Sequence, residues 1–136
     1  MCISARIATA AVALLATISF APWAWATDLN GAWAADSSVC SKVFVKGGNK
    51  ISFTPDAELY GAGLLIEGNQ ATGSFQKCRI KSTRADGDIL HVVAACSTGI
   101  MVSDTQATVK VVDNNHITLT VVGPGEIGFP LIRCSM

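Results

Sequence analysis

The sequence predicts an all-β protein: a single antiparallel up-and-down barrel of about eight strands that follows an N-terminal signal peptide. Runs rich in Val, Ile, Thr and Phe recur along the chain, and these residues suit a half-buried pleated sheet. Turn-forming pairs separate the runs at short intervals, which favours consecutive hairpins. Closing such a ribbon into a barrel removes exposed strand edges. A two-sheet β-sandwich is the alternative.

The first 26 residues have the pattern of a secretory signal peptide. A positive charge precedes an uncharged, mostly apolar run at 7–21, and Ala24-Trp25-Ala26 places small residues where a signal peptidase reads them. The alternative is an uncleaved anchor, because the segment is just long enough to span a bilayer, but Pro22 disfavours it. We expect a signal peptide at 1–26, a barrel domain at 27–136, and a periplasmic or secreted protein with no stable membrane span.

The charge balance disfavours a nucleic-acid partner. The chain carries ten basic and ten acidic residues, whereas proteins that bind nucleic acids usually need a basic excess. Removing residues 1–26 takes away one basic residue, Arg6, and leaves a net charge of −1. Half of the residues are hydrophobic and only 15% are charged, which excludes a disordered chain.

Four cysteines remain after removal of the predicted signal peptide: Cys40, Cys78, Cys96 and Cys134. An even number in an exported chain predicts two disulfides. Zinc is the competing use of four cysteines, but structural zinc sites draw on closely spaced pairs, and no C-x-x-C pair occurs here. Each disulfide is expected to stabilise a domain of this size by about 2–4 kcal/mol.

The predicted hairpin register bears on how the cysteines pair. With Asp86-Gly87 as the turn, Cys78 and Cys96 face opposite sides of their hairpin unless a bulge or a longer turn intervenes. The favoured pairing therefore joins Cys40 to one of them and Cys134 to the other. The sequence by itself allows three connectivities.

Four pairs of residues predict the hairpin turns, because each tolerates the positive φ of a tight two-residue turn. They are Gly47-Gly48, Gly68-Asn69, Asp86-Gly87 and Asn114-Asn115. Apolar and polar residues alternate visibly after the last pair, from His116 to Val121, as expected for a strand with one buried face. With residues 31–35 and 127–133, about eight to ten strands result.

The segment Leu29-Asn30-Gly31-Ala32-Trp33 resembles the G-x-W signature on the first strand of lipocalins and related calycin-type barrels. In that family, an arginine on the last strand packs over the tryptophan and closes the base of the barrel. The resemblance implies that role for Gly31, Trp33 and Arg133. A guanidinium over an indole face is worth roughly 0.5–2 kcal/mol. The domain is shorter than a typical lipocalin, and the other lipocalin signatures are absent.

Two further resemblances are less informative about activity. The G-x-W start and the cysteines are similar to those of small periplasmic barrels that inhibit secreted bacterial metalloproteases. Those inhibitors act through an N-terminal trunk, and only residues 27–30 precede Gly31 here, so inhibition is not expected. The domain also resembles uncharacterised small exported proteins of Gram-negative bacteria, which implies no activity.

Alternating cations define one candidate surface. Lys77, Arg79 and Lys81 share one face of a predicted strand, while Cys78 and Ile80 face inward. We call the three cations the cationic stripe. It fits either a solvated strand face that deters edge pairing or a contact for an anionic partner. Arg84 extends the stripe only if a bulge inverts the alternation.

No motif in the sequence predicts catalysis, a metal or a cofactor. His91 and His116 belong to no close metal-binding pair, and no serine lies in a nucleophile elbow. An enzyme would need one of these histidines within hydrogen-bond reach of a carboxylate in a cleft. We therefore expect a non-catalytic protein.

Two function classes fit the sequence best. The first is a binding module for a small apolar ligand or a protein partner, which an apolar cavity of at least about 300 Å³ would favour. Filling of the barrel by Phe44, Phe53, Phe75 and Leu119 would exclude the small ligand. The second is a structural or envelope-interaction protein without a discrete ligand site. Its expected mark is an exposed apolar patch formed by Ile100, Met101, Ile127 and Phe129.

Overall fold

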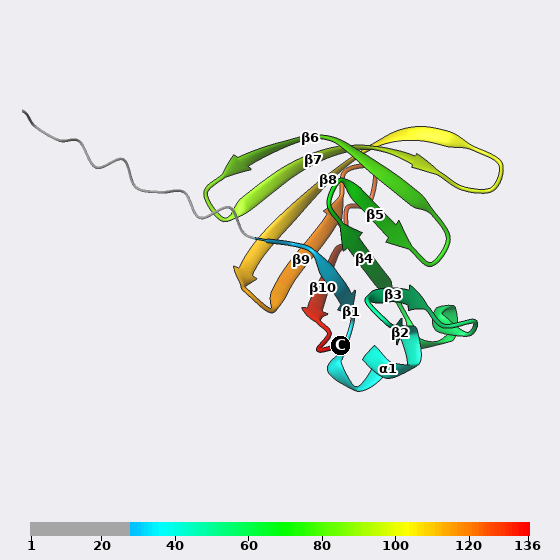
Figure 1. Ribbon diagram of the computed structural model, residues 1–136. Coiled ribbons are helices and arrows are strands. Elements are labelled where there is room, and N and C mark those ends of the chain that lie inside the picture. The colour runs from blue at the N-terminus through cyan, green and yellow to red at the C-terminus, as the bar shows by residue number, and fades with distance from the viewer. Residues whose placement is uncertain (1–27) are drawn as a thin grey trace, which may run out of the picture.

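The computed structural model describes residues 28–136, so the predicted signal peptide and its cleavage site lie outside the described residues. Ten strands, one short α-helix and two 3-10 helices follow one another in this part of the chain (Figure 1). The elements are β1 (Gly31–Ala34), η1 (Ser37–Val39), α1 (Cys40–Val43), β2 (Phe44–Gly47), β3 (Lys50–Phe53), η2 (Ala57–Tyr60), β4 (Gly63–Glu67), β5 (Gln70–Gly73), β6 (Lys77–Asp86), β7 (Ile89–Ser97), β8 (Val102–Asp113), β9 (His116–Val121) and β10 (Gly128–Arg133).

Eight strands form a closed antiparallel barrel in the order β1-β10-β9-β8-β7-β6-β5-β4. Strands β4 to β10 follow one another up and down, and β1 closes the barrel by pairing with both β10 and β4. The predicted all-β barrel is therefore confirmed, and the sandwich alternative is wrong. Two turns, at Gly68-Asn69 and Asn114-Asn115, lie where the sequence predicts them. The other two lie one residue later, at Gly48-Asn49 and Gly87-Asp88.

Residues 35–62 leave the barrel between β1 and β4 and pack against its outer surface, and we call this segment the flap. It contains α1 and the separate β2–β3 hairpin. Val43 and Phe44 of the flap are fully buried against the outward-facing side chains of Ala32, Ala34 and Leu65. Because Ala32 and Ala34 are small, the flap approaches β1 closely. Figure 1 shows the flap beside β1 and β4.

A disulfide fastens the flap to the end of the last strand. Cys40 in α1 is bonded to Cys134, with 5.7 Å between their Cα atoms. Cys134 follows β10 and extends its pairing with β1, since its amide donates to the carbonyl of Ala32 over 2.8 Å. The bond therefore joins two segments that are 94 residues apart in the sequence.

The second disulfide joins Cys78 to Cys96, so two disulfides form as expected but the favoured pairing was wrong. Two differences account for this: the turn lies at Gly87-Asp88 instead of Asp86-Gly87, and a β-bulge in β6 at Lys81, between Ile80 and Ser82, shifts the β6–β7 register by one residue. A one-residue shift moves every side chain beyond it to the other face. Cys78 and Cys96 consequently lie directly opposite each other.

Candidate functional site

The Trp33 side chain points into the barrel and is fully buried near one end. The Arg133 guanidinium carbon lies 4.3 Å from the centroid of its rings, and Trp33 and Arg133 are paired residues of β1 and β10. The indole N–H donates to the carbonyl of Leu29 over 2.9 Å. The expected contact between Trp33 and Arg133 is therefore present, and we call these two residues the plug.

The Arg133 guanidinium also joins three segments of backbone around that end. Its Nε donates to the carbonyl of Asn114 over 2.9 Å, its Nη2 donates to that of Asp28 over 2.7 Å, and its Nη1 donates to that of Asn30. Gly31 leaves room for this arrangement, because a Cβ there would lie 3.1 Å from Nη1. Gly31 also has a φ of +130°, which residues with side chains rarely adopt. These contacts account for the G-x-W pattern in physical terms.

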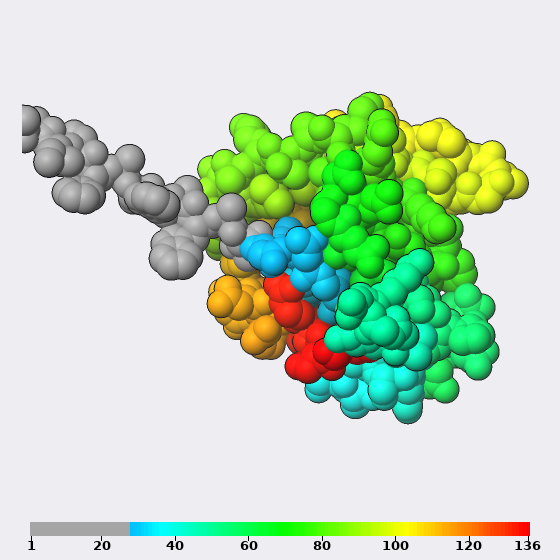
Figure 2. Space-filling view, viewed as in Figure 1, coloured from blue at the N-terminus to red at the C-terminus, as the bar shows by residue number. Residues whose placement is uncertain are grey.

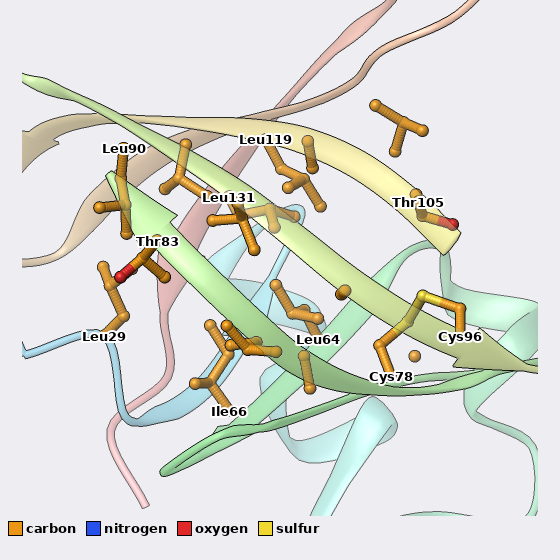
Figure 3. A pocket seen from close by; sticks show the side chains of 18 of the residues that line it. Leu29, Leu64, Ile66, Cys78, Thr83, Leu90, Cys96, Thr105, Leu119 and Leu131 are labelled. Atoms are coloured by element: carbon orange, nitrogen blue, oxygen red, sulfur yellow. A yellow bond between two sulfur atoms is a disulfide. The ribbon is translucent and has the colours of Figure 1, made fainter. Parts of the chain in front are cut away.

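Beyond the plug, the barrel encloses a cavity of about 580 Å³. Its wall comes from the inward-facing residues of β4 to β10, and Figure 3 shows the side chains of Leu64, Ile66, Leu90, Leu119 and Leu131 along it. Several inward positions that face this space are small. They include Ala71, Gly73, Ala94 and Ala107. Large side chains normally fill an eight-stranded barrel, so these residues leave it hollow.

The phenylalanines that would have filled the barrel lie elsewhere. Phe44 and Phe53 pack against each other in the flap with ring centroids 5.0 Å apart, and Phe75 is 74% exposed. Of the four expected filling residues, only Leu119 lines the cavity. The condition that would have excluded a small-ligand role is therefore not met.

The cavity wall is almost free of charge. Asp28 is its one ionisable side chain in the described part of the chain, and it lies beside the plug, where its carboxylate accepts from the amide of Asn30 over 2.9 Å. Thr83 and Thr105 add hydroxyl groups, and the Cys78–Cys96 disulfide adds two sulfurs (Figure 3). Such a wall favours a ligand whose enclosed part is apolar and uncharged.

The end of the barrel opposite the plug has an apolar border. Val121 and Phe129 line the cavity and are also exposed to solvent, at 42% and 44%, so the cavity reaches the surface there. Eight of the thirteen exposed large apolar side chains belong to the loops and strand ends at this end, and we call them the apolar rim. They are Phe75, Ile100, Met101, Val102, Val121, Val122, Ile127 and Phe129. The loop between β7 and β8 projects on the right of Figures 1 and 2, in yellow.

The cationic stripe starts beside this rim, where β6 begins. Lys77 and Arg79 are exposed on the outside of the barrel, while Cys78 and Ile80 line the cavity. Lys81, at the bulge, forms an ion pair with Asp104 at 3.2 Å. Beyond the bulge, Thr83 lines the cavity, so the next residue, Arg84, lies on the outer face. The bulge thus inverts the alternation, which is the condition under which Arg84 extends the stripe.

Both histidines lie next to an aspartate, but outside the cavity. His116 Nδ1 lies 2.8 Å from Asp113 Oδ1, and each side chain is 55% exposed. The hydrogen bond from His116 holds the pKa of Asp113 below its ordinary value, and one from the amide of Asn115 lowers it further. The pair flanks the tight turn between β8 and β9. His91 Nε2 lies 3.9 Å from Asp86 Oδ2, beyond hydrogen-bond distance.

His116 and Asp113 border a surface groove of about 370 Å³ together with apolar residues of β9 and β10. An enzyme would need a histidine and a carboxylate together in a cleft, and His116 and Asp113 have that arrangement at this groove. Among the other described residues of the groove, Thr118 adds one hydroxyl group, and the rest are apolar. The hydrogen bonds of the pair stabilise the turn between β8 and β9, because the Asp113 carboxylate accepts from both His116 and the amide of Asn115.

Two further features are absent from the described part of the chain. Residues 28–136 contain no cluster of three or more potential ligand side chains that could hold a metal ion. No helix in this range is long and apolar enough to cross a membrane.

Comparisons with known proteins found no matching family model, no matching curated protein and no matching solved structure. The likeness to lipocalins therefore rests on two features of the chain itself: the closed eight-stranded antiparallel barrel and the plug.

Proposed function

We propose that the protein is a non-catalytic carrier that binds a small apolar molecule inside the barrel. The observation that supports this most directly is the hollow interior. At about 580 Å³, the cavity falls within the range of small-molecule sites, which is roughly 300–1,000 Å³. The plug lies at one end of the cavity, and the apolar rim borders its opening at the other end, where a ligand could enter.

The residues of the wall define the class of ligand. Apolar cavities stay dry and take up apolar molecules, and each methylene group that leaves water contributes about 0.8 kcal/mol. Within residues 28–136, Asp28 is the only ionisable residue of the wall and lies beside the plug, so the wall near the entrance offers no charged side chain to hold an ion inside. The ligand is an uncharged apolar molecule or the apolar chain of an amphiphile.

We further propose that the protein acts in the periplasm or outside the cell, after export. Two disulfides in a chain of this size support an oxidising compartment. Lipocalin-like transport by a small secreted barrel is the nearest analogy, and it rests on the fold alone.

Uptake of an apolar probe tests the proposal. N-phenylnaphthylamine fluoresces strongly only when it leaves water, and the wild-type protein should bind it at one site. Ala94→Phe places a large side chain in the cavity, because Ala94 faces inward, and should reduce probe affinity at least about tenfold, a difference of ~1.4 kcal/mol.

The matched control is Ala95→Phe on the same strand. Ala95 pairs with Arg79 and Asp104 and does not line the cavity, so probe binding should stay unchanged. Equal binding by wild-type protein and the Ala94→Phe variant, with both folded, would contradict the proposal. Native mass spectrometry of protein purified from its own compartment then identifies the molecule that it carries.

A further inference from the structure

We infer that the apolar rim docks on a lipid bilayer, so that the mouth of the barrel opens directly onto the membrane surface. This inference rests on the proposed carrier function, since it assigns the place where the apolar ligand enters and leaves. It adds a lipid surface as the partner, with a preference for anionic lipids.

The first support is the contrast between the two ends of the barrel. The three short loops at the mouth, residues 74–76, 98–101 and 122–127, contain a single charged residue, Glu126; the longer flap also joins the barrel at this end and carries charges of both signs. Their exposed side chains include Ile100 at 92% and Phe75 at 74%. The turns at the plug end carry Asn and Asp, with Asp86 and Asp113 beside them. An exposed apolar surface of this kind marks an interaction site.

The second support is the continuity between the rim and the cavity. Val121 and Phe129 belong to both, since each lines the cavity and is exposed. A protein that covered this surface would also cover the entrance. If the side chains of the rim insert into a bilayer, the mouth of the cavity faces the acyl chains of the lipids. An apolar molecule can then pass between the bilayer and the cavity without crossing water. Burial of the rim in lipid is favourable, because it removes apolar surface from water.

The third support is the charge next to the rim. Lys77 and Arg79 follow directly after the loop that carries Phe75, and their partners on the neighbouring strands are uncharged: Thr72 and Ser97 for Lys77, and Gln70 and Ala95 for Arg79. Neither cation forms an ion pair within residues 28–136, whereas Lys81 is paired with Asp104. Two such cations beside inserted apolar side chains complement the anionic headgroups of a membrane.

Flotation with vesicles tests the docking. The exported form of the protein is mixed with vesicles of phosphatidylcholine, or of equal parts phosphatidylcholine and phosphatidylglycerol. We expect it to float with both and more strongly with the anionic mixture. The variant Phe75→Ser/Ile100→Ser/Ile127→Ser changes one side chain in each loop, none of which lines the cavity. It should partition at least about tenfold less into either vesicle.

The matched control is Val45→Ser/Val112→Ser, which replaces exposed valines away from the mouth and should float as the wild type does. Lys77→Gln/Arg79→Gln should remove the preference for anionic vesicles, and Lys81→Gln, at a paired cation, should not. Flotation of the triple serine variant at the wild-type level would overturn the inference. So would wild-type protein that stays unbound or that instead forms a dimer through the rim.

The two proposals fail separately in these experiments. Uptake of N-phenylnaphthylamine in solution depends on the cavity and should be the same in the triple serine variant as in the wild type. Loss of flotation with intact probe uptake supports docking, while probe uptake that is absent from the wild type refutes the carrier function irrespective of flotation.

Discussion

The flap packs tightly against β4 at Gly63. A Cβ at Gly63 would lie 2.7 Å from Val43 Cγ1 and 2.9 Å from Phe53 Cε1. Val43 is β-branched and fully buried, so its side chain has little freedom to move aside. The variant Gly63→Ala therefore forces the flap away from the barrel. Overpacking of this kind costs about 1–3 kcal/mol, and the lower chain entropy of the unfolded alanine variant offsets about 0.4–1 kcal/mol.

We expect Gly63→Ala to lose about 1–2 kcal/mol of unfolding free energy, which lowers the Tm by roughly 4–8 °C in a domain of this size. Gly47→Ala is the matched control, because a Cβ there meets nothing within 4 Å. It should be neutral or slightly stabilising. Urea unfolding followed by circular dichroism gives the unfolding free energy of each variant, and thermal unfolding gives its Tm. Equal midpoints for the two variants would refute the packing argument.

Three further predictions concern the plug end, the flap and the β8–β9 turn. Gly31→Ala should cost about 1–3 kcal/mol in thermal unfolding, because φ is +130° there. Replacing Cys40 and Cys134 together by serine should cost about 4–5 kcal/mol in denaturant unfolding, since their bond closes a loop with a sequence separation of 94; a loss under about 1 kcal/mol would contradict this. The Asp113 carboxyl should titrate below 3.8 by NMR and return towards that value in His116→Ala. Because folding lowers this pKa, the contact stabilises the fold above pH 3.8 and is lost as the pH falls below it.

Local patterns in the sequence were sufficient to predict the barrel. Gly68-Asn69 and Asn114-Asn115 lie at the turns themselves. Gly68 has the positive φ that a tight turn was expected to need, whereas Asn114 and Asn115 form their turn without one. The G-x-W resemblance placed Trp33 beside Arg133 although 100 residues separate them in the numbering, and the contact is present. Each of these predictions depends on one or two residues whose chemistry restricts them to a single role.

The disulfide pairing depends on a register that alternation alone does not give. A single bulge at Lys81 reverses the faces of β6, and a strict alternation carried from the turn to Cys78 was therefore wrong by one residue. The run Lys81-Ser82-Thr83-Arg84 contains four polar residues in succession. That interruption of the alternation is the signal that would have placed the bulge.

The cavity was not predictable from any one residue. It results from small residues on several strands that face the same space, among them Ala71, Ala94 and Ala107. The flap draws Phe44 and Phe53 away from the barrel into its own core. Only the three-dimensional pairing of the strands shows that the interior lacks large side chains.

The Cys40–Cys134 bond also determines how the molecule responds to mechanical force. Tension applied between Asp28 and Met136 passes through this bond, because Asp28 precedes Cys40 and Met136 follows Cys134 in the chain. Pulling would peel β1 from its neighbours up to Cys40 and then stop. The chain between the two cysteines, roughly 330 Å when fully extended, would remain shielded from the load until the sulfur–sulfur bond was reduced.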